Sequence, residues 1–132
     1  MIVFVDTSAL YALMDADDRN HVPAGAAWAQ WLDQPVQFIT SNYVLLESVA
    51  LIQHQLGIQA ARQFEEELAP VLNVHWVDAD IHAIALKTML AIGKRDLSLV
   101  DCANIEIMRR LGHRTIFAFD RHYPEQGLTQ LP

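Results

Sequence analysis

Four acidic side chains lie in apolar surroundings, close to points where the chain is expected to turn from one element to the next. They are Asp6, Glu47, Asp101 and Asp120. The first three interrupt strongly apolar text, namely FVDTSAL, NYVLLESVALI and LSLVDCANIEIM. Carboxylates are rarely buried unless they are paired or bound to a metal ion. We therefore predict that the four acids form one site.

Converging carboxylates point to a particular kind of chemistry. They repel one another, so without a cation some of them would have to stay protonated. Mg²⁺ or Mn²⁺ removes this conflict, because hard cations prefer oxygen ligands. Such ions lower the pKa of bound water and stabilise charge on a leaving oxygen, and a pair of them suits in-line attack at phosphorus. The predicted chemistry is metal-dependent hydrolysis of a phosphodiester, with the four acids as catalytic residues and metal ligands.

The first two acids each have a purely structural alternative. Asp6 is a good helix N-cap, although Thr7 or Ser8 could cap the same helix and free Asp6 for other work. Glu47 could lie on a solvated stripe of its helix. Because that stripe would be narrow, we expect the Glu47 side chain to point inward.

The other two acids have alternatives of the same kind. Asp101 follows Ser98 by three residues, so the two could form a polar stripe on one helix face. Asp120 could be an ordinary loop aspartate. Asp96 could be an outer carboxylate, but we favour it as the N-cap of the helix that carries Asp101.

Several other kinds of site lack their sequence signals. No CxxC pair or HExxH motif supports a zinc site, and no GxxxxGK[ST] pattern supports nucleotide hydrolysis by a P-loop. The six histidines show no ligand spacing. A phosphatase of the haloacid dehalogenase kind needs a second Asp where this chain has Ser8, and a receiver domain needs paired acids that are absent around Ile2–Thr7. A metal-dependent nuclease site fits better than these.

Length, composition and charge limit the remaining possibilities. The chain has 132 residues, 52% of them hydrophobic, which fits one domain with a real core. Its formal net charge of −7 disfavours a general nucleic-acid binder. Two bound divalent cations would change that −7 to −3, so the charge does not exclude a metal-dependent nuclease. No apolar run reaches the roughly 18 residues of a membrane span, MIVFVD lacks a basic leader, and the single Cys102 allows no internal disulfide. We expect a cytoplasmic protein without a membrane segment.

The elements that must position the acids alternate along the chain. The expected strands are Ile2–Val5, Val36–Thr40, Val71–Val77, Thr115–Phe119 and a short Leu128–Leu131. The expected helices are Ser8–Met14, Ala24–Leu32, Ser41 or Asn42 to Gln55, Gln59–Leu68, Asp78 or Asp80 to Ile92, and Leu97–Leu111, the last closed by Gly112. Strands separated by helices predict a parallel sheet in a layered α/β domain, where ligands bind outside the carboxyl ends of the strands. Two acids directly follow strands and two lie near helix starts, so all four can reach this edge.

The chain resembles the PIN domain family, and within it the VapC-type ribonuclease toxins of bacterial toxin–antitoxin pairs. The matching text is FVDTSALYAL, TSNYVLLE, LSLVDCANIEIMRRLG and FAFDRHY, in the family's order and over essentially the whole chain. Arg121 and His122 fit the family pattern after Asp120, and Tyr123 stands where an aromatic residue is usual. The resemblance implies a single PIN-like domain over residues 1–132. It also implies a three-layer α/β/α fold with a central parallel sheet of about five strands.

The resemblance also implies an activity. It implies RNA cleavage that depends on Mg²⁺ or Mn²⁺, with Asp6 and Asp101 as the most direct metal ligands. Hydroxyl groups of Thr7, Ser8 or Ser98 would lie near the metal. A homodimer and a cognate antitoxin partner are implied in the same way. The alternative is a non-catalytic PIN-like module that binds RNA or protein.

Basic and aromatic residues give weaker signals. Six of the nine basic residues fall in the last third of the chain, where they could contact RNA phosphates: Lys94, Arg95, Arg109, Arg110, Arg114 and Arg121. For Arg109 and Arg110 we favour charge complementarity with a helix C-terminus. Trp28 and Trp31 are expected in the core or in a dimer contact.

Overall fold

Five short segments rich in β-branched and aromatic residues form one sheet in the computed structural model, which describes residues 1–132. All neighbouring strands are parallel, in the order β3-β2-β1-β4-β5. The strands are β1 Ile2–Val5, β2 Gln37–Ser41, β3 Leu72–His75, β4 Thr115–Phe117 and β5 Thr129–Leu131. Each is followed or preceded by helix, which is how parallel strands are connected. The predicted α/β fold with a five-stranded parallel sheet is confirmed.

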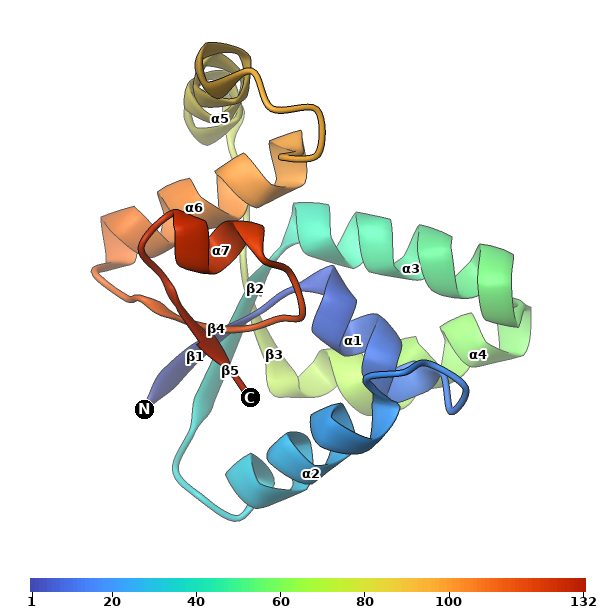
Figure 1. The fold of residues 1–132 in the computed structure, drawn as a ribbon. Helices are drawn as coiled ribbons and strands as arrows, with labels where there is room; N and C mark the ends of the chain where they lie inside the picture. Colours follow the sequence, from blue (N-terminus) through green and yellow to red (C-terminus); the bar gives the residue numbers. More distant parts are fainter.

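Helices connect the strands and surround the sheet (Figure 1). They are α1 Thr7–Met14, α2 His21–Leu32, α3 Asn42–Leu56, α4 Ile58–Gln63, α5 Ala79–Ile92, α6 Leu99–Leu111 and α7 His122–Glu125. Side-chain caps start the long ones, with Ser41 before α3, Asp78 before α5 and Ser98 before α6. Gly112 ends α6 at a φ of 72°, a left-handed backbone that glycine adopts without strain. None of these helices has the length and apolar character that a membrane span requires.

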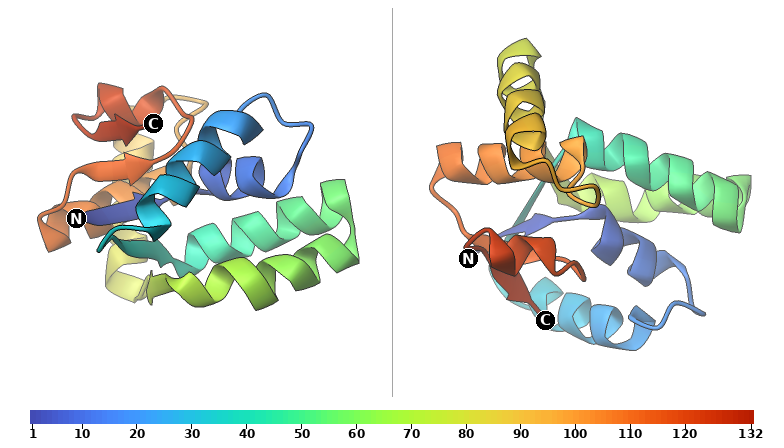
Figure 2. Two further views of the ribbon diagram at one scale, coloured as in Figure 1. Left: turned by 90° about the horizontal axis from the view of Figure 1, so that it is seen from below. Right: turned by 45° about the horizontal axis from the view of Figure 1, so that its top comes forward.

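The sheet lies between α2 on one side and α6 on the other (Figure 2). Strand register places Val3 beside Phe38, so side chains at these paired positions share one face. On that face, the Trp28 ring of α2 lies 4.4 Å from Phe38, and the Trp31 ring lies 4.9 Å from Phe117, between ring centroids. Both tryptophans therefore contribute to the core, and the three-layer arrangement follows from these contacts.

Several element boundaries differ from those expected. The segment Gln59–Leu68 is not one regular helix, because α4 gives way to a π-helical turn over Phe64–Leu68. The third and fourth strands are shorter than predicted, and α6 begins at Leu99 instead of Leu97. Helix α7 was not predicted. Its four residues, HYPE, are too few to show a helical period, so only tertiary packing can specify it.

Candidate active site

Asp6 is fixed at the point where β1 passes into α1. Its backbone amide donates to the carbonyl of Phe117 on the neighbouring strand (3.1 Å). Its Oδ2 atom accepts hydrogen bonds from the backbone N–H of Ser8 (3.2 Å) and from the Ser8 hydroxyl (2.7 Å). The Ser8 hydroxyl in turn accepts from the backbone N–H of Phe119 (3.0 Å). Asp6 is therefore the N-cap of α1, and only one of its two oxygens is used for capping.

Asp101 is held in a closely similar way at the start of α6. The Ser98 hydroxyl accepts from the backbone N–H of Asp101 (3.1 Å), and Oδ2 of Asp101 accepts from the backbone N–H of Ser98 (3.0 Å). This is a capping box, in which two unpaired amides of the helix start are satisfied reciprocally. Capping again uses one carboxylate oxygen and leaves Oδ1 directed elsewhere.

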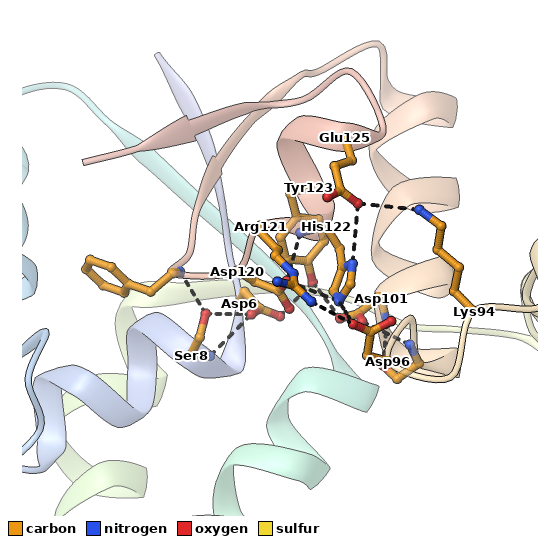
Figure 3. Close-up of polar contacts among 12 residues, drawn as sticks. Asp6, Ser8, Lys94, Asp96, Asp101, Asp120, Arg121, His122, Tyr123 and Glu125 are labelled. Carbon is orange, nitrogen blue, oxygen red and sulfur yellow. Dashed lines mark hydrogen bonds and ion pairs between the residues drawn. The ribbon is translucent and has the colours of Figure 1, made fainter.

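The two remaining oxygens meet at one hydroxyl group (Figure 3). The Tyr123 hydroxyl lies 2.9 Å from Oδ1 of Asp6 and 3.0 Å from Oδ1 of Asp101. The amide nitrogen of Asn104 donates to this hydroxyl (3.0 Å) and to Oδ1 of Asp6 (3.2 Å). All four residues are buried. Asp6 and Asp101, which are 95 residues apart in the printed sequence, are thus brought together as predicted.

Burial makes this pair electrostatically costly. Desolvation raises the pKa of Asp6 to about 6, against the opposing effect of its hydrogen bonds from Ser8 and Tyr123, and the nearby charge of Asp101 raises it further. Burial, followed by the charges of Asp6 and Asp101, raises the pKa of Tyr123 well above its usual 10. The tyrosine is therefore a neutral donor with a single proton for two carboxylates. A divalent cation would relieve the repulsion that remains.

Asp120 belongs to a second, outer group of charges. Its Oδ1 atom accepts from the backbone N–H of His122 (2.9 Å) and lies 3.9 Å from Nε2 of that ring. The His122 ring is buried, with Nε2 3.2 Å from Asp96 and Nδ1 3.7 Å from Glu125. Asp120 therefore lies beside the central pair, in contact with a histidine that three carboxylates surround (Figure 3).

The expected role of Asp96 is wrong. Ser98 caps α6, and the Asp96 carboxylate instead contacts Arg121 (3.3 Å) and His122 (3.2 Å). Lys94 lies 3.5 Å from Glu125. These ion pairs join the loop before α6 to α7, the helix that carries Tyr123. Asp96 was the expected cap because Asp is a strong N-cap residue, but Ser98 with Asp101 three residues later fits the capping-box spacing.

Glu47 does not point inward, contrary to expectation. The side of α3 that faces the core carries Val44, Ser48 and Ile52, four residues apart, and Glu47 lies a quarter of a turn away on the exposed side. Its carboxylate makes no ion pair or hydrogen bond. It lines an open, mostly apolar groove formed with Tyr43, Leu46, Ala50, Leu99 and Val100. That groove borders the start of α6, where Asp101 lies.

The three hydroxyl residues that were expected near the metal divide into two kinds. Ser8 and Ser98 each bond to a carboxylate of the central pair, as described above. Thr7 is directed away from the pair, because its hydroxyl donates to the carbonyl of Val44 (3.4 Å) and accepts from Ser48 (3.1 Å). Thr7 thus ties α1 to α3 and has no contact with Asp6 or Asp101.

The structure brings together Asp6 and Asp101, places Asp120 nearby through His122, and leaves Glu47 on the groove. No three acidic, histidine or cysteine side chains are grouped closely enough to hold one ion. The inward donors nevertheless suit Mg²⁺ or Mn²⁺ in kind: two carboxylate oxygens, with the buried Oδ1 of Asn104, which has no hydrogen-bond partner, close by. Burial raises the pKa of the Cys102 thiol, which keeps a soft thiolate ligand out of this region.

Two residues of this site were not predicted from sequence. Asn104 carries no sequence signal of its own, and Tyr123 is expected only as the aromatic residue that is usual at its position in the family. The spacing from Asp101 to Asn104, three residues on one helix, puts both on the same face and could have suggested a shared role. Nothing local could have placed the Tyr123 hydroxyl between two aspartates.

The capping box gives a first testable prediction. We expect Ser98→Ala to lower the free energy of unfolding by about 1 kcal/mol, since N-cap serines contribute about 0.5–2 kcal/mol. Urea denaturation measures this directly. Ser41→Ala is the matched control, because Ser41 caps α3 through the backbone N–H of Val44 (3.1 Å). Both variants should lose stability, and an unchanged midpoint for Ser98→Ala would contradict the capping box.

Comparison with known proteins assigns the family. The PIN domain family matches residues 3–127 of the chain. The chain belongs to the PIN domain family. This PIN domain is 32% identical over 131 residues to the 23S rRNA-specific endonuclease VapC20 of Mycobacterium tuberculosis, covering 98% of each chain. It is also 28% identical over 126 residues to ribonuclease VapC26 of the same organism, covering 92% of this chain and 88% of the relative.

Solved structures support the same family. The crystal structure of M. tuberculosis VapC20, described as a sarcin-ricin loop cleaving toxin, superposes on this PIN domain with a TM-score of 0.86 at 33% identity, covering 98% of this chain and 97% of VapC20. FitAcB from Neisseria gonorrhoeae shares the fold with a TM-score of 0.67 at 15% identity, covering 100% and 97%. Ribonuclease toxin activity is the function that membership of this family supports.

Proposed function

We propose that this PIN domain, taken as one unit over residues 1–132, is a metal-dependent endoribonuclease and the toxin of a toxin–antitoxin pair. The observation that carries the proposal is the pair of inward oxygens, Oδ1 of Asp6 and Oδ1 of Asp101, which meet at the carboxyl edge of the sheet. Ligands of parallel α/β sheets bind at this edge. Capping uses only one oxygen of each carboxylate. It therefore does not explain why the two remaining oxygens are buried close together, where their charges repel each other.

Each residue has a proposed role in this reaction. Asp6 and Asp101 would hold Mg²⁺ or Mn²⁺, while Ser8 and Ser98 fix the orientation of their carboxylates. A bound ion would supply an activated water and stabilise charge on the scissile phosphate. Asp120 would complete the acidic set from the outer group. Glu47 would approach from the groove on α3, where its exposed carboxylate is free to turn toward the phosphate or its water.

RNA is the proposed substrate. VapC20 is named for 23S rRNA and for the sarcin-ricin loop, and we extend the same substrate class, a loop of structured RNA, to this chain. Among the basic residues, Arg110 pairs with Asp80 and Glu106, and Arg109 also pairs with Glu106, which fits a structural role. Arg95 and Arg114 are exposed and have no carboxylate partner. Both are therefore free to contact phosphates.

Protein partners are also part of the proposal. We propose a homodimer and a cognate antitoxin, as the family resemblance implies. Exposed apolar side chains support contacts of this kind: Leu46 on α3 is 71% exposed and Leu90 on α5 is 69% exposed. Leu46 lines the apolar groove between α3 and the start of α6, and exposed apolar patches commonly mark protein interfaces.

The experiment that tests the proposed activity is cleavage of ribosomal RNA by the purified protein. We expect cuts at discrete positions with Mg²⁺ or Mn²⁺, no cuts with excess EDTA, and restored cleavage when Mn²⁺ is returned. The matched control is the same protein with Ca²⁺ in place of Mn²⁺, since Ca²⁺ prefers a larger and looser ligand shell.

A different outcome would favour the alternative. If no RNA is cut with either metal and titration calorimetry detects no Mn²⁺ binding, the chain is better described as a non-catalytic PIN-like binding module. One observation favours that module: the Tyr123 hydroxyl already contacts both inward oxygens. Cleavage that persists in EDTA would instead overturn the metal dependence alone.

A further inference from the structure

The Tyr123 hydroxyl is the only group that contacts both aspartates of the central pair. Asp6 is otherwise bonded to Ser8 and Asn104, and Asp101 to Ser98. The two carboxylates extend from the starts of α1 and α6, and no direct bond joins them. Their separation therefore depends on a third segment, α7, which supplies the tyrosine (Figure 3).

The tyrosine itself is firmly held. It is fully buried, and its backbone carbonyl accepts from the amides of Gln126 (3.0 Å) and Leu128 (3.1 Å) at the end of α7. The ion pairs of Asp96 and Glu125 hold the outer side of the same helix against the loop before α6. A ring fixed at both ends can set the position of its hydroxyl, and with it the two oxygens that contact the hydroxyl.

Asn104 fixes the direction of that hydroxyl. A carboxylate only accepts hydrogen bonds, so the side of the Asn104 amide that faces Asp6 must be its NH₂ group, which also donates to Tyr123. This orientation leaves Oδ1 of Asn104 buried without a partner. An unpaired buried acceptor is destabilising, and native proteins rarely leave one. The orientation of Asn104 thus holds the Tyr123 hydroxyl in place, although it leaves a polar atom unpaired in the core.

We propose that Tyr123, oriented by Asn104, is a positioning residue that sets the spacing of Asp6 and Asp101 for a divalent cation. The inference rests on the proposed function, and it identifies the residue that holds the two metal ligands in position. Groups that orient metal ligands without touching the metal typically change its affinity about 10–100-fold. Tyr123 occupies that position for both ligands at once.

The test compares Mn²⁺ binding by two tyrosine variants. Tyr123→Phe keeps the buried ring and removes only the hydroxyl. We expect it to bind Mn²⁺ about 10-fold more weakly in titration calorimetry, with a matching fall in RNA cleavage that excess Mn²⁺ partly restores. The matched control is Tyr11→Phe, which removes a tyrosine–aspartate hydrogen bond of the same type, from Tyr11 to Asp15 (2.8 Å), at the far end of α1. The control should bind Mn²⁺ like the wild type.

Further measurements separate positioning from stability. Asn104→Leu keeps a similar volume, frees the hydroxyl, and should weaken Mn²⁺ binding in the same direction as Tyr123→Phe. Thermal melts of the metal-free variants show whether each folds. Mn²⁺ affinity of Tyr123→Phe equal to that of the wild type would overturn the positioning role while leaving the proposed nuclease intact. A wild-type protein that neither binds Mn²⁺ nor cuts RNA would overturn both.

Discussion

Replacing Asp101 with asparagine should reduce RNA cleavage by at least about 100-fold. Mutating a residue that only orients a metal ligand already lowers metal affinity about 10–100-fold, and Asp101 is a proposed ligand itself. The substitution removes a charge and leaves one side-chain oxygen. That oxygen can still accept from the backbone N–H of Ser98, as Oδ2 does in the native capping box (3.0 Å). The helix start should therefore survive, and the loss should fall on the metal site.

The measurement is single-turnover cleavage of ribosomal RNA with saturating Mn²⁺, together with a thermal melt of each protein. Asp78→Asn is the matched control, because Asp78 caps α5 through the backbone N–H of Ile81 (2.9 Å) and lies outside the site. The control should cut RNA at the wild-type rate. Normal cleavage by Asp101→Asn would remove Asp101 from the active site and leave it as a capping residue only.

Each aspartate uses one carboxylate oxygen for helix capping and directs the other into the site, which explains why the pair could be located from sequence. A parallel α/β chain must pass from strand to helix at the carboxyl edge of the sheet, and an acidic cap is favoured there. Asp6, directly after β1, satisfies that local preference with one oxygen and offers the other to the site. Asp101 lies on a helix that follows α5 and a loop, and it divides its two oxygens in the same way. Capping and catalysis, which looked like competing interpretations of Asp6, use different atoms of its carboxylate, and the same holds for Asp101, which was not expected to cap a helix.

Most of the features that sequence reasoning missed depend on tertiary packing. Glu47 is exposed because α3 buries a different side of the helix against the core. The residues before and after Glu47 are nearly all apolar, so the sequence does not show which side is buried. Helix α7 has no detectable period, yet it delivers Tyr123 to the pair. Asp96 lost the cap position to Ser98 and joined Arg121 and His122 instead. Local preference alone does not decide which side of α3 carries Glu47 or where α7 packs.

The overall charge also looks different once these contacts are known. The net −7 was weak evidence against an RNA partner. Asp6 and Asp101 contribute to it from buried positions that repel each other, and Asp96, Asp120 and Glu125 contribute around one histidine. Five of the sixteen acidic residues are therefore concentrated at one edge of the sheet, with Lys94 and Arg121 paired to two of them. A concentrated charge of this kind attracts divalent cations, whose binding reverses its effect on phosphates.

The same concentration of charge predicts that Asp6→Asn stabilises the metal-free protein at neutral pH. The pKa of Asp6 is about 6 in the folded protein and 3.8 for an ordinary aspartate. Between those values the folded state holds a proton that the unfolded state has released, so wild-type stability falls as the pH rises through this window. At pH 7.5 the gap corresponds to at most about 3 kcal/mol, at 1.36 kcal/mol per unit of pKa. Asparagine carries no charge and escapes this loss.

Two local features make the substitution structurally tolerable. The oxygen of the new amide can accept from the backbone N–H of Ser8, as Oδ2 of Asp6 does, so the cap of α1 persists. Its NH₂ group would face the NH₂ group of Asn104. Because Oδ1 of Asn104 has no partner, that side chain can turn and accept the new hydrogen bond. The unpaired oxygen of Asn104 thus provides an acceptor for the amide that replaces the carboxylate.

Urea denaturation in EDTA at pH 4.5 and pH 7.5 measures the effect. The stability difference between Asp6→Asn and wild type should grow with pH, whereas Asp78→Asn should show no such growth. Adding Mn²⁺ at pH 7.5 should then stabilise the wild type and leave Asp6→Asn unchanged, because only a folded state that binds the ion gains from it. Loss of stability by Asp6→Asn at pH 7.5 would mean that the Asp6 charge is already compensated without metal, and the case for a cation at this pair would fail with it.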